Sequence, residues 1–182
     1  KTRVLTHRIA YLVERCGVPP TNILAVTFTN KAADEMRERV RRQIRHDLSG
    51  AWIGTFHSIC ARILRQQAES LGFARQFTIY DDADQLSLIK QLTADLQIAT
   101  DKMSPGTIQR RIGHAKNALL SPDDFARNSG GNFLDEIVAK VYHAYQRALK
   151  ENNAMDFDDL LIHPIRLFEN HPAILQNYQS RF

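Results

Sequence analysis

The chain has 182 residues, of which 43% are hydrophobic and 24% charged, and its formal net charge is +4. This length and composition are enough for a buried core, in one domain or in one domain with a subdomain. The two cysteines, Cys16 and Cys60, exclude a disulfide framework, and no apolar run approaches a membrane-spanning length. We therefore expect a globular, cytoplasmic protein without a membrane partner.

Charge is distributed unevenly along the chain. Residues 1–75 hold 13 Lys+Arg against 6 Asp+Glu, and residues 76–182 hold 11 against 14, so the two parts carry +7 and −3. The basic part also contains the strand-like segments. This asymmetry favours an anionic partner for the basic part, either nucleic acid or nucleotide phosphate.

The first 80 residues alternate between helical and strand patterns. The sequence predicts a helix at 4–13, a strand at 23–28, a helix at 32–40, a strand at 51–54, a helix at 58–72 and a strand at 77–80. The segment 23–28 is apolar without polar alternation, which is typical of a parallel strand covered on both faces. Such alternation predicts an α/β fold with right-handed crossovers and one parallel sheet.

From Asp81 onward the strand pattern disappears and capped helices follow one another. Asp81, Ser104-Pro105 and Ser121-Pro122 are typical helix starts, and residues 134–149 form an amphipathic pattern of about five turns. Asp156 can cap a helix at 157–168, which Pro164 should kink or divide, and residues 171–182 look helical. We expect a small α/β part at 1–80 and a helical subdomain at 81–182.

Polar and aromatic residues follow each of the first two predicted strands. Thr27-Phe28-Thr29-Asn30-Lys31 follows one, and Thr55-Phe56-His57-Ser58 follows the other. The carboxyl ends of parallel strands share one sheet edge, where open α/β sheets bind ligands. A single-stranded nucleic acid needs aromatic faces for its bases and donors for its phosphates at such an edge. In the alternative reading, both phenylalanines are core residues and the threonines merely favour strands.

Two stretches carry a resemblance to a known family. Residues 25–33 (AVTFTNKAA) with Glu35-Met36, followed by residues 54–58 (GTFHS), resemble motifs Ia and Ib of the UvrD/Rep/PcrA DNA helicases of superfamily 1. Lys1-Thr2 is similar to the end of a Walker A motif, and residues 155–161 (MDFDDLL) resemble the stretch before motif II. The resemblance implies a partial RecA-like P-loop NTPase sheet (domain 1A, residues 1–80) with an all-helical 1B subdomain (residues 81–182).

The resemblance implies an ATP-dependent 3′-to-5′ DNA helicase that moves on single-stranded DNA and unwinds duplex DNA, in repair or replication. Its cofactors would be ATP and Mg²⁺, bound at the P-loop Lys1 and by Thr2, the implied Mg²⁺ ligand. Its partners would be single-stranded DNA, junctions between single-stranded and duplex DNA, and the helicase domains 2A and 2B. The implied DNA-binding residues are Phe28, Thr29, Asn30, Lys31, Thr55, Phe56 and His57.

The chain departs from the family pattern in one respect. The Asp-Glu pair of motif II and the arginines of later motifs are not found in it, so the catalytic set is incomplete and we expect these 182 residues alone not to hydrolyse ATP. Two alternatives stay open. One is a helicase-nuclease of the AddA/RecB kind, and the other is a non-catalytic module that binds single-stranded DNA or docks a partner.

Three further patterns favour ordinary structural roles. His57 and Cys60 have a zinc-like spacing without a matching pair, so we expect no zinc site. The aspartates near Asp81 and Asp156 lie at helix starts, where caps belong. The arginines at 37–45 either follow phosphates or form a solvated helix face in which Glu35 and Arg39 pair.

Overall fold

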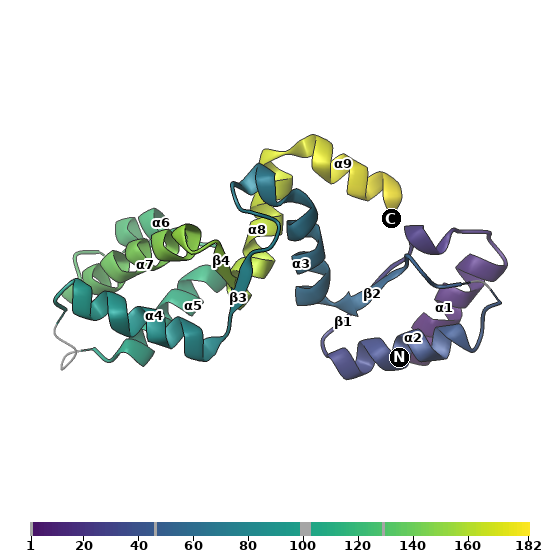
Figure 1. Ribbon diagram of the computed structural model, residues 1–182, viewed down its shortest axis with the longest axis horizontal. Coiled ribbons are helices and arrows are strands. Elements are labelled where there is room, and N and C mark those ends of the chain that lie inside the picture. The colour runs from purple at the N-terminus through teal and green to yellow at the C-terminus, as the bar shows by residue number, and fades with distance from the viewer. Residues whose placement is uncertain (1, 46, 99–102, 129) are drawn as a thin grey trace. The chain divides into compact units, whose positions relative to one another are not determined.

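The computed structural model describes residues 2–45, 47–98, 103–128 and 130–182 (Figure 1). It is a mixed α/β structure with two compact units. The N-terminal unit comprises Lys1–Ile63 and Pro164–Phe182, and the helical unit comprises Leu64–His163. The limits of the two units reflect how residues of the chain contact one another. The assignment of residues 1–80 and 81–182 to helicase subdomains stays a prediction. Among the described residues, no helix is both long and apolar enough to cross a membrane.

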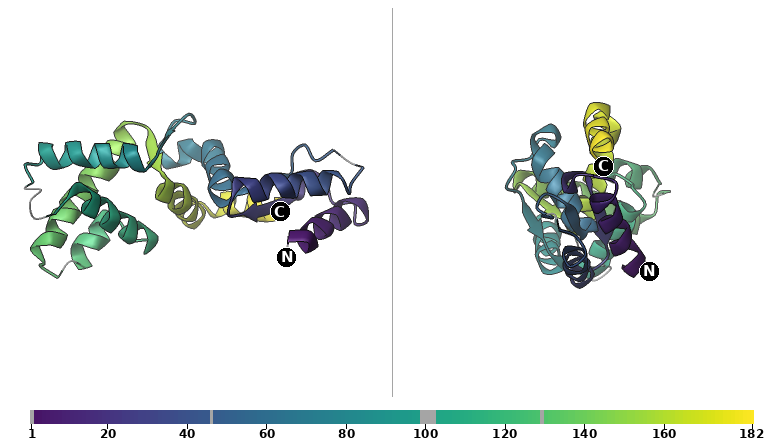
Figure 2. Two further views of the ribbon diagram at one scale, coloured as in Figure 1. Left: turned by 90° about the horizontal axis from the view of Figure 1, so that it is seen from below. Right: turned by 90° about the vertical axis from the view of Figure 1, so that its right-hand side faces the viewer.

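The N-terminal unit begins with the predicted order of helix, strand, helix and strand. Its elements are α1 (Thr2–Glu14), the 3₁₀ turn η1 (Pro20–Asn22), β1 (Leu24–Thr27), α2 (Asn30–Arg41), β2 (Trp52–Thr55), the start of α3 (Phe56–Gln67), the end of α8 (Phe157–Asn170) and α9 (Pro172–Arg181). β1 and β2 pair in parallel, with Leu24 opposite Trp52 and Thr27 opposite Thr55. Figure 2 shows α1 and α2 running side by side, in agreement with their contacts.

Apolar residues at helical spacing form the core of this unit. Ile9 and Val13 on α1 pack with Met36 and Val40 on α2 and with Ile53 on β2. The sequence places these residues one or two turns apart, so each helix buries a single stripe. This packing holds α2 against the two strands.

The two strands of this unit differ in burial, which corrects one prediction. All four residues of β2 are buried, whereas Leu24 and Val26 on β1 are 43% and 37% exposed. The prediction that the first strand is covered on both faces is therefore wrong for the described residues. An apolar run indicates that a strand favours burial, but it does not show what covers the strand. Here the exposed face of β1 borders a groove that is also lined by α1 and Phe182.

The helical unit contains most of the second half of the chain. Its elements are the end of α3, η2 (Ala68–Leu71), β3 (Thr78–Tyr80), α4 (Asp82–Asp95), α5 (Pro105–Asn117), α6 (Pro122–Asn128), α7 (Phe133–Glu151), β4 (Ala154–Asp156) and the start of α8. The 19 residues of α7 confirm the predicted five-turn helix. Its core is built from α4, α5 and α7, with Ile89, Ile108, Ile112, Val138 and Tyr145 at the centre.

Side-chain caps fix the starts of these helices as the sequence predicts. The Asp81 carboxylate accepts hydrogen bonds from the backbone N–H groups of Ala83 and Asp84, and Asp84 bonds back to the Asp81 N–H, which completes a capping box. Ser104 caps α5, ahead of Pro105 at its first position. The helices therefore begin where short polar side chains satisfy their free N–H groups.

The Asp81 cap gives a direct test of this local structure. Asp81→Ala should lower the free energy of unfolding by about 1–2 kcal/mol, because two helix N–H groups lose their acceptor. Asp82→Ala, which keeps the cap and removes a neighbouring exposed carboxylate, serves as the matched control. Urea unfolding followed by circular dichroism measures both, and equal midpoints for the two variants would contradict the capping role.

β3 and β4 form a second parallel sheet that the sequence does not predict. Thr78 pairs with Ala154 and Tyr80 with Asp156, whereas the prediction joins the strand at 77–80 to the first sheet. The prediction that strands cease after Asp81 is wrong as well, because β4 is a strand. Ala-Met-Asp carries little β-propensity, so its long-range pairing and complete burial decide its conformation.

The proline within α8 does not divide the helix. α8 runs from Phe157 to Asn170 with Pro164 inside it, although the sequence predicts a kink or a division there. Of these two predicted outcomes, division is wrong. An interior proline lowers the stability of a helix, and here the burial of neighbours such as Leu160 and Leu167 offsets that loss.

A buried ionic network lies at the centre of the helical unit. Lys116 on α5 is 1% exposed, and its Nζ lies 2.6 Å from Asp156 Oδ2 and 2.8 Å from Asp159 Oδ1. The Tyr145 hydroxyl donates to Asp156 Oδ2 at 2.9 Å, and the Asp159 N–H donates to Asp156 Oδ1 at 2.8 Å. Asp156 thus caps α8 as predicted and also joins α5, α7 and β4.

The protonation states of this network follow from its surroundings. Burial raises the pKa of Asp159, but the charges of Lys116 and His163 outweigh burial and hold that pKa below its ordinary value. Burial and the neighbouring charge of Asp156 raise the pKa of Tyr145, so its hydroxyl stays a neutral donor. Lys116 Nζ thus lies between two carboxyl groups, each of which also accepts a further side-chain hydrogen bond, from Tyr145 to Asp156 and from Gln146 to Asp159.

Candidate nucleic-acid interface

The two strands of the N-terminal unit end side by side and present two phenylalanines. Thr27 at the end of β1 pairs with Thr55 at the end of β2, so Phe28 and Phe56 follow at the same level of the sheet. Their ring centroids lie 5.5 Å apart with the planes inclined at 47°. The parallel register alone brings together two aromatic residues that are separated in the sequence.

Both rings are open to solvent. Phe28 is 90% exposed and Phe56 is 42% exposed. The alternative in which both phenylalanines are core residues is therefore wrong. An exposed pair of rings in mutual contact offers flat apolar surface at a sheet edge, which is what a stacked base requires.

The threonines next to these rings form hydrogen bonds at the starts of α2 and α3. The Thr29 hydroxyl accepts a hydrogen bond from the Ala32 N–H at 3.2 Å and so caps α2. The Thr55 hydroxyl accepts one from the Ser58 N–H, also at 3.2 Å, at the start of α3. The Thr27 hydroxyl donates to the Thr29 carbonyl at 3.0 Å. Phe28 therefore lies in a short bend between β1 and α2 that threonine hydrogen bonds hold, and Phe56 is the first residue of α3, directly after β2.

The helix starts beside the rings favour an anion. Neither α2 nor α3 has an acidic residue in its first turn, so the partial positive charge of each N-terminus is not neutralised there. Asn30 and Lys31 are exposed in the first turn of α2, and His57 is half-buried in the first turn of α3. Amide, ammonium and imidazole donors thus lie next to the aromatic pair.

Three predicted site residues stand apart from this exposed group. Thr55 is buried, and its oxygen is engaged at the start of α3, so its place in the structure is that of a positioning residue. Lys1 and the side chain of Thr2 lie outside the described residues. The ligand roles predicted for all three stay predictions.

The arginine-rich end of α2 is largely paired with acids on the same helix. Arg39 lies 3.3 Å from Glu35, the pair that the solvated-face reading predicts, and Arg42 lies 3.0 Å from Glu38. Arg37 contacts Asp34 at 2.5 Å and donates from Nε to the Ile53 carbonyl at 3.2 Å. This pattern is typical of a solvated helix face that also ties α2 to β2.

Gly54 is a site residue that the family motif contains but that sequence reasoning leaves without a role. A Cβ at Gly54 would lie 2.5 Å from Ser58 Oγ and 3.4 Å from Ile59 Cδ1. The Ser58 hydroxyl in turn donates to the Thr55 carbonyl at 2.9 Å. The glycine therefore lets the start of α3 lie directly against β2, which places Phe56 beside Phe28.

This close approach predicts a paired effect. Gly54→Ala should lower the free energy of unfolding by about 1–3 kcal/mol, because the added methyl group overpacks the start of α3. The double variant Gly54→Ala/Ser58→Ala should recover part of that loss, since it removes the nearest atom. Chemical denaturation of the single and double variants measures the recovery, and strictly additive losses would contradict the steric explanation.

Comparison with known proteins identifies the family. The sequence profile described as UvrD/REP helicase N-terminal domain matches residues 1–182. The chain belongs to the UvrD/REP helicase family. It is 47% identical over 182 residues to the ATP-dependent DNA helicase PcrA of Bacillus subtilis (strain 168) and to that of Staphylococcus aureus (strain Mu50 / ATCC 700699). A PcrA helicase of Leuconostoc citreum is also 47% identical, over 183 residues.

These matches cover the whole of this chain but a smaller share of its relatives. The chain spans 24% of the length of the Bacillus PcrA and 25% of that of the Staphylococcus PcrA. The UvrD/REP match confirms the resemblance that motifs Ia and Ib carry. It also means that the exposed Phe28–Phe56 pair lies in the N-terminal domain of a helicase family.

Proposed function

We propose that this chain is the N-terminal part of an ATP-dependent DNA helicase that moves 3′ to 5′ on single-stranded DNA and unwinds duplex DNA. The observation that carries the proposal is the exposed Phe28–Phe56 pair at the ends of two parallel strands. Bases would stack on these rings, and phosphates would accept hydrogen bonds from donors beside them. The PcrA relatives, named as ATP-dependent DNA helicases, support this reading over a module without catalysis.

In this proposal the residues around the rings have separate tasks. Asn30, Lys31, His57 and the N-terminal N–H groups of α2 contact the DNA backbone. Thr29 and Thr55 hold the starts of α2 and α3, and Thr29, which is exposed, also reaches the DNA strand. A sugar-phosphate contact carries no sequence information, so the protein would move along DNA of any sequence.

ATP and Mg²⁺ would bind at the start of α1. α1 begins at Thr2 and has no acidic residue in its first turn, so its N-terminus suits an anionic phosphate. We assign Lys1 to the phosphates and Thr2 to Mg²⁺ by their match to the Walker A motif. ATP hydrolysis would supply the energy for movement, with the remaining catalytic groups coming from the rest of the helicase.

The proposal also sets the wider arrangement of the protein. Residues 1–80 would be part of the RecA-like domain 1A and residues 81–182 the 1B subdomain, and domains 2A and 2B would close the DNA groove. The DNA substrate would be a junction between single-stranded and duplex DNA. Two free cysteines, with the pKa of the Cys60 thiol raised by burial, fit work in a reducing cytoplasm.

Unwinding by the full-length protein tests the proposal. With ATP and Mg²⁺, it should separate a duplex with a 3′ single-stranded tail and leave a duplex with a 5′ tail intact. Lys1→Ala should abolish unwinding and DNA-stimulated ATP hydrolysis while single-stranded DNA binding persists. Strand separation that does not need ATP, or equal separation of the two tailed duplexes, would contradict it.

A further inference from the structure

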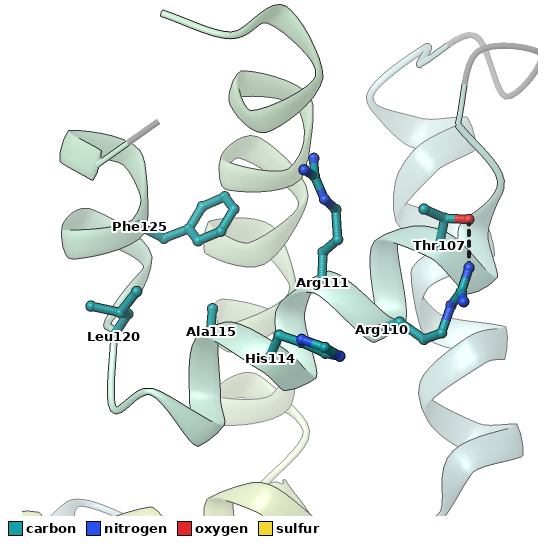
Figure 3. Close-up of a pocket in the computed structure, with 7 residues that line it drawn as sticks. All are labelled: Thr107, Arg110, Arg111, His114, Ala115, Leu120 and Phe125. Atoms are coloured by element: carbon teal, nitrogen blue, oxygen red, sulfur yellow. Dashed lines mark hydrogen bonds between the residues drawn. The ribbon is translucent and has the colours of Figure 1, made fainter. Parts of the chain in front are cut away.

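The helical unit holds a cavity that the proposed helicase function does not use. It lies along α5, beside the segment that follows α5 and beside α6, and its volume is about 480 Å³ (Figure 3). Small-molecule sites commonly have volumes of about 300–1,000 Å³, with apolar walls and a few polar groups. All seven lining residues belong to the helical unit, whereas the Phe28–Phe56 pair belongs to the other unit.

One wall of the cavity is a stripe of hydrogen-bond donors on α5. Thr107, Arg110 and His114 lie three and four residues apart, so they share one face of the helix. Arg110 donates from Nη2 to Thr107 Oγ1 at 3.3 Å, which steadies one corner of the guanidinium (Figure 3). Arg110 forms no ion pair within the part of the chain that the structure describes, so its other N–H groups are available to an anion.

The neighbouring arginine, Arg111, differs from Arg110 because it forms an ion pair. Arg111 is paired with Asp135 on α7, so its positive charge is already matched. Arg111 therefore forms part of the wall, and Arg110 with His114 supplies the donors. Both of these side chains are exposed, so a ligand can reach them from solvent.

The other wall is apolar and flat. Leu120 follows α5, and Phe125 projects from α6 toward α5 (Figure 3). The Phe125 ring packs edge-on with the Tyr142 ring, at 6.5 Å between centroids and 81° between planes. This contact with a buried residue fixes Phe125 in place, and an aromatic ring held in this way can support a base or another flat group.

The surrounding charge limits the size of the anion. The helical unit holds 11 Lys+Arg against 14 Asp+Glu, a net charge of −3, so the positive charge of Arg110 in this stripe is local. Asp123 and Asp124 lie on α6 next to the cavity, paired with His143 and Arg127. A long polyanion would meet these carboxylates, whereas a single terminal phosphate would meet mainly the stripe.

We propose that this cavity binds a nucleoside monophosphate, either as a free nucleotide or as the 5′-phosphorylated end of a DNA strand. The phosphate oxygens accept hydrogen bonds from the Arg110 guanidinium and the His114 ring, a geometry that suits the fork of an arginine. The base lies against Phe125 and Leu120. The proposal concerns a separate site and does not rest on the helicase function.

Binding of AMP to the full-length protein tests the site. A saturating non-hydrolysable ATP analogue with Mg²⁺ occupies the ATP site, and AMP binding is then measured by isothermal titration calorimetry. Arg110→Gln should weaken AMP binding about 10-fold or more, since it removes a charged donor. Phe125→Leu, which keeps an apolar side chain in the core, should weaken it about fivefold or more. Arg147→Gln, which removes an exposed charge of the same unit outside the cavity, should leave it unchanged.

A competition experiment distinguishes the two sources of the phosphate, a free nucleotide and the end of a DNA strand. If the natural ligand is a strand end, a 5′-phosphorylated oligonucleotide displaces AMP and the same oligonucleotide with a 5′-hydroxyl does not. If it is a free nucleotide, neither oligonucleotide displaces AMP. Absence of AMP binding at millimolar concentration, or equal weakening by Arg110→Gln and Arg147→Gln, would overturn the proposal.

Discussion

Lys116→Met should destabilise the chain by about 3–5 kcal/mol, because it leaves the Asp156 and Asp159 carboxylates buried without their cation. Methionine has nearly the length of lysine, so the change removes charge more than volume. A loss of this size is a large fraction of the 5–15 kcal/mol that a typical domain has. Urea unfolding followed by circular dichroism measures it.

Two further variants separate charge from packing. Lys140→Met removes an exposed lysine from α7 and should change stability by less than about 0.5 kcal/mol. The triple variant Lys116→Met/Asp156→Asn/Asp159→Asn removes the whole charge set and should recover most of the loss. If Lys116→Met proves as mild as Lys140→Met, the buried network does not stabilise the fold.

The same network predicts how stability depends on pH. The folded pKa of Asp159 lies below its ordinary value, so its contribution is present above about pH 4 and is lost as the pH falls through the folded pKa. Lys116→Met removes the cation that lowers this pKa. The stability difference between wild type and Lys116→Met should therefore shrink as the pH falls toward the folded pKa of Asp159, and a constant difference would contradict the ionic account.

Phe28→Ala should weaken binding of single-stranded DNA by about 5- to 150-fold, which corresponds to the roughly 1–3 kcal/mol of one base stacked on an aromatic ring. Because Phe28 is 90% exposed, its removal should leave the unfolding midpoint nearly unchanged. Fluorescence anisotropy with a labelled oligo-dT measures the affinity.

Two comparisons make this result specific. Tyr11→Ala removes another exposed aromatic ring of the N-terminal unit, on α1, and should leave the affinity unchanged. Phe28→Ala and Phe56→Ala should be non-additive, because the two rings are in contact and would share a base. Equal affinity of Phe28→Ala and wild type would refute a stacking role for this ring.

The sequence predicts the sheet edge well because its signals are local. The Thr-Phe pairs follow apolar runs of similar length, and parallel pairing then brings Phe28 and Phe56 to one level. The caps at Thr29, Asp81 and Ser104 are equally local, since each depends on a short side chain and the next three residues.

The features that the sequence does not predict depend on distant contacts. β4 has three residues and forms by pairing with β3, whose residues lie far away in the chain. Lys116 and Asp156 are 40 residues apart, and a lysine on an amphipathic helix is usually a surface residue. The cavity beside Arg110 depends on how packed helices approach one another, which spacing alone does not encode. Gly54 differs, because the atoms that an added Cβ would meet belong to the nearby residues Ser58 and Ile59.

Photo-crosslinking locates the residues that contact single-stranded DNA. Single-stranded DNA that carries 5-iodouracil is irradiated with the full-length protein, and the attached residues are identified by mass spectrometry. We expect crosslinks at Phe28 or Phe56, and their loss when both are replaced by leucine. Crosslinks confined to other aromatic residues, such as Tyr11 or Phe133, would contradict a DNA-binding edge at the ends of β1 and β2.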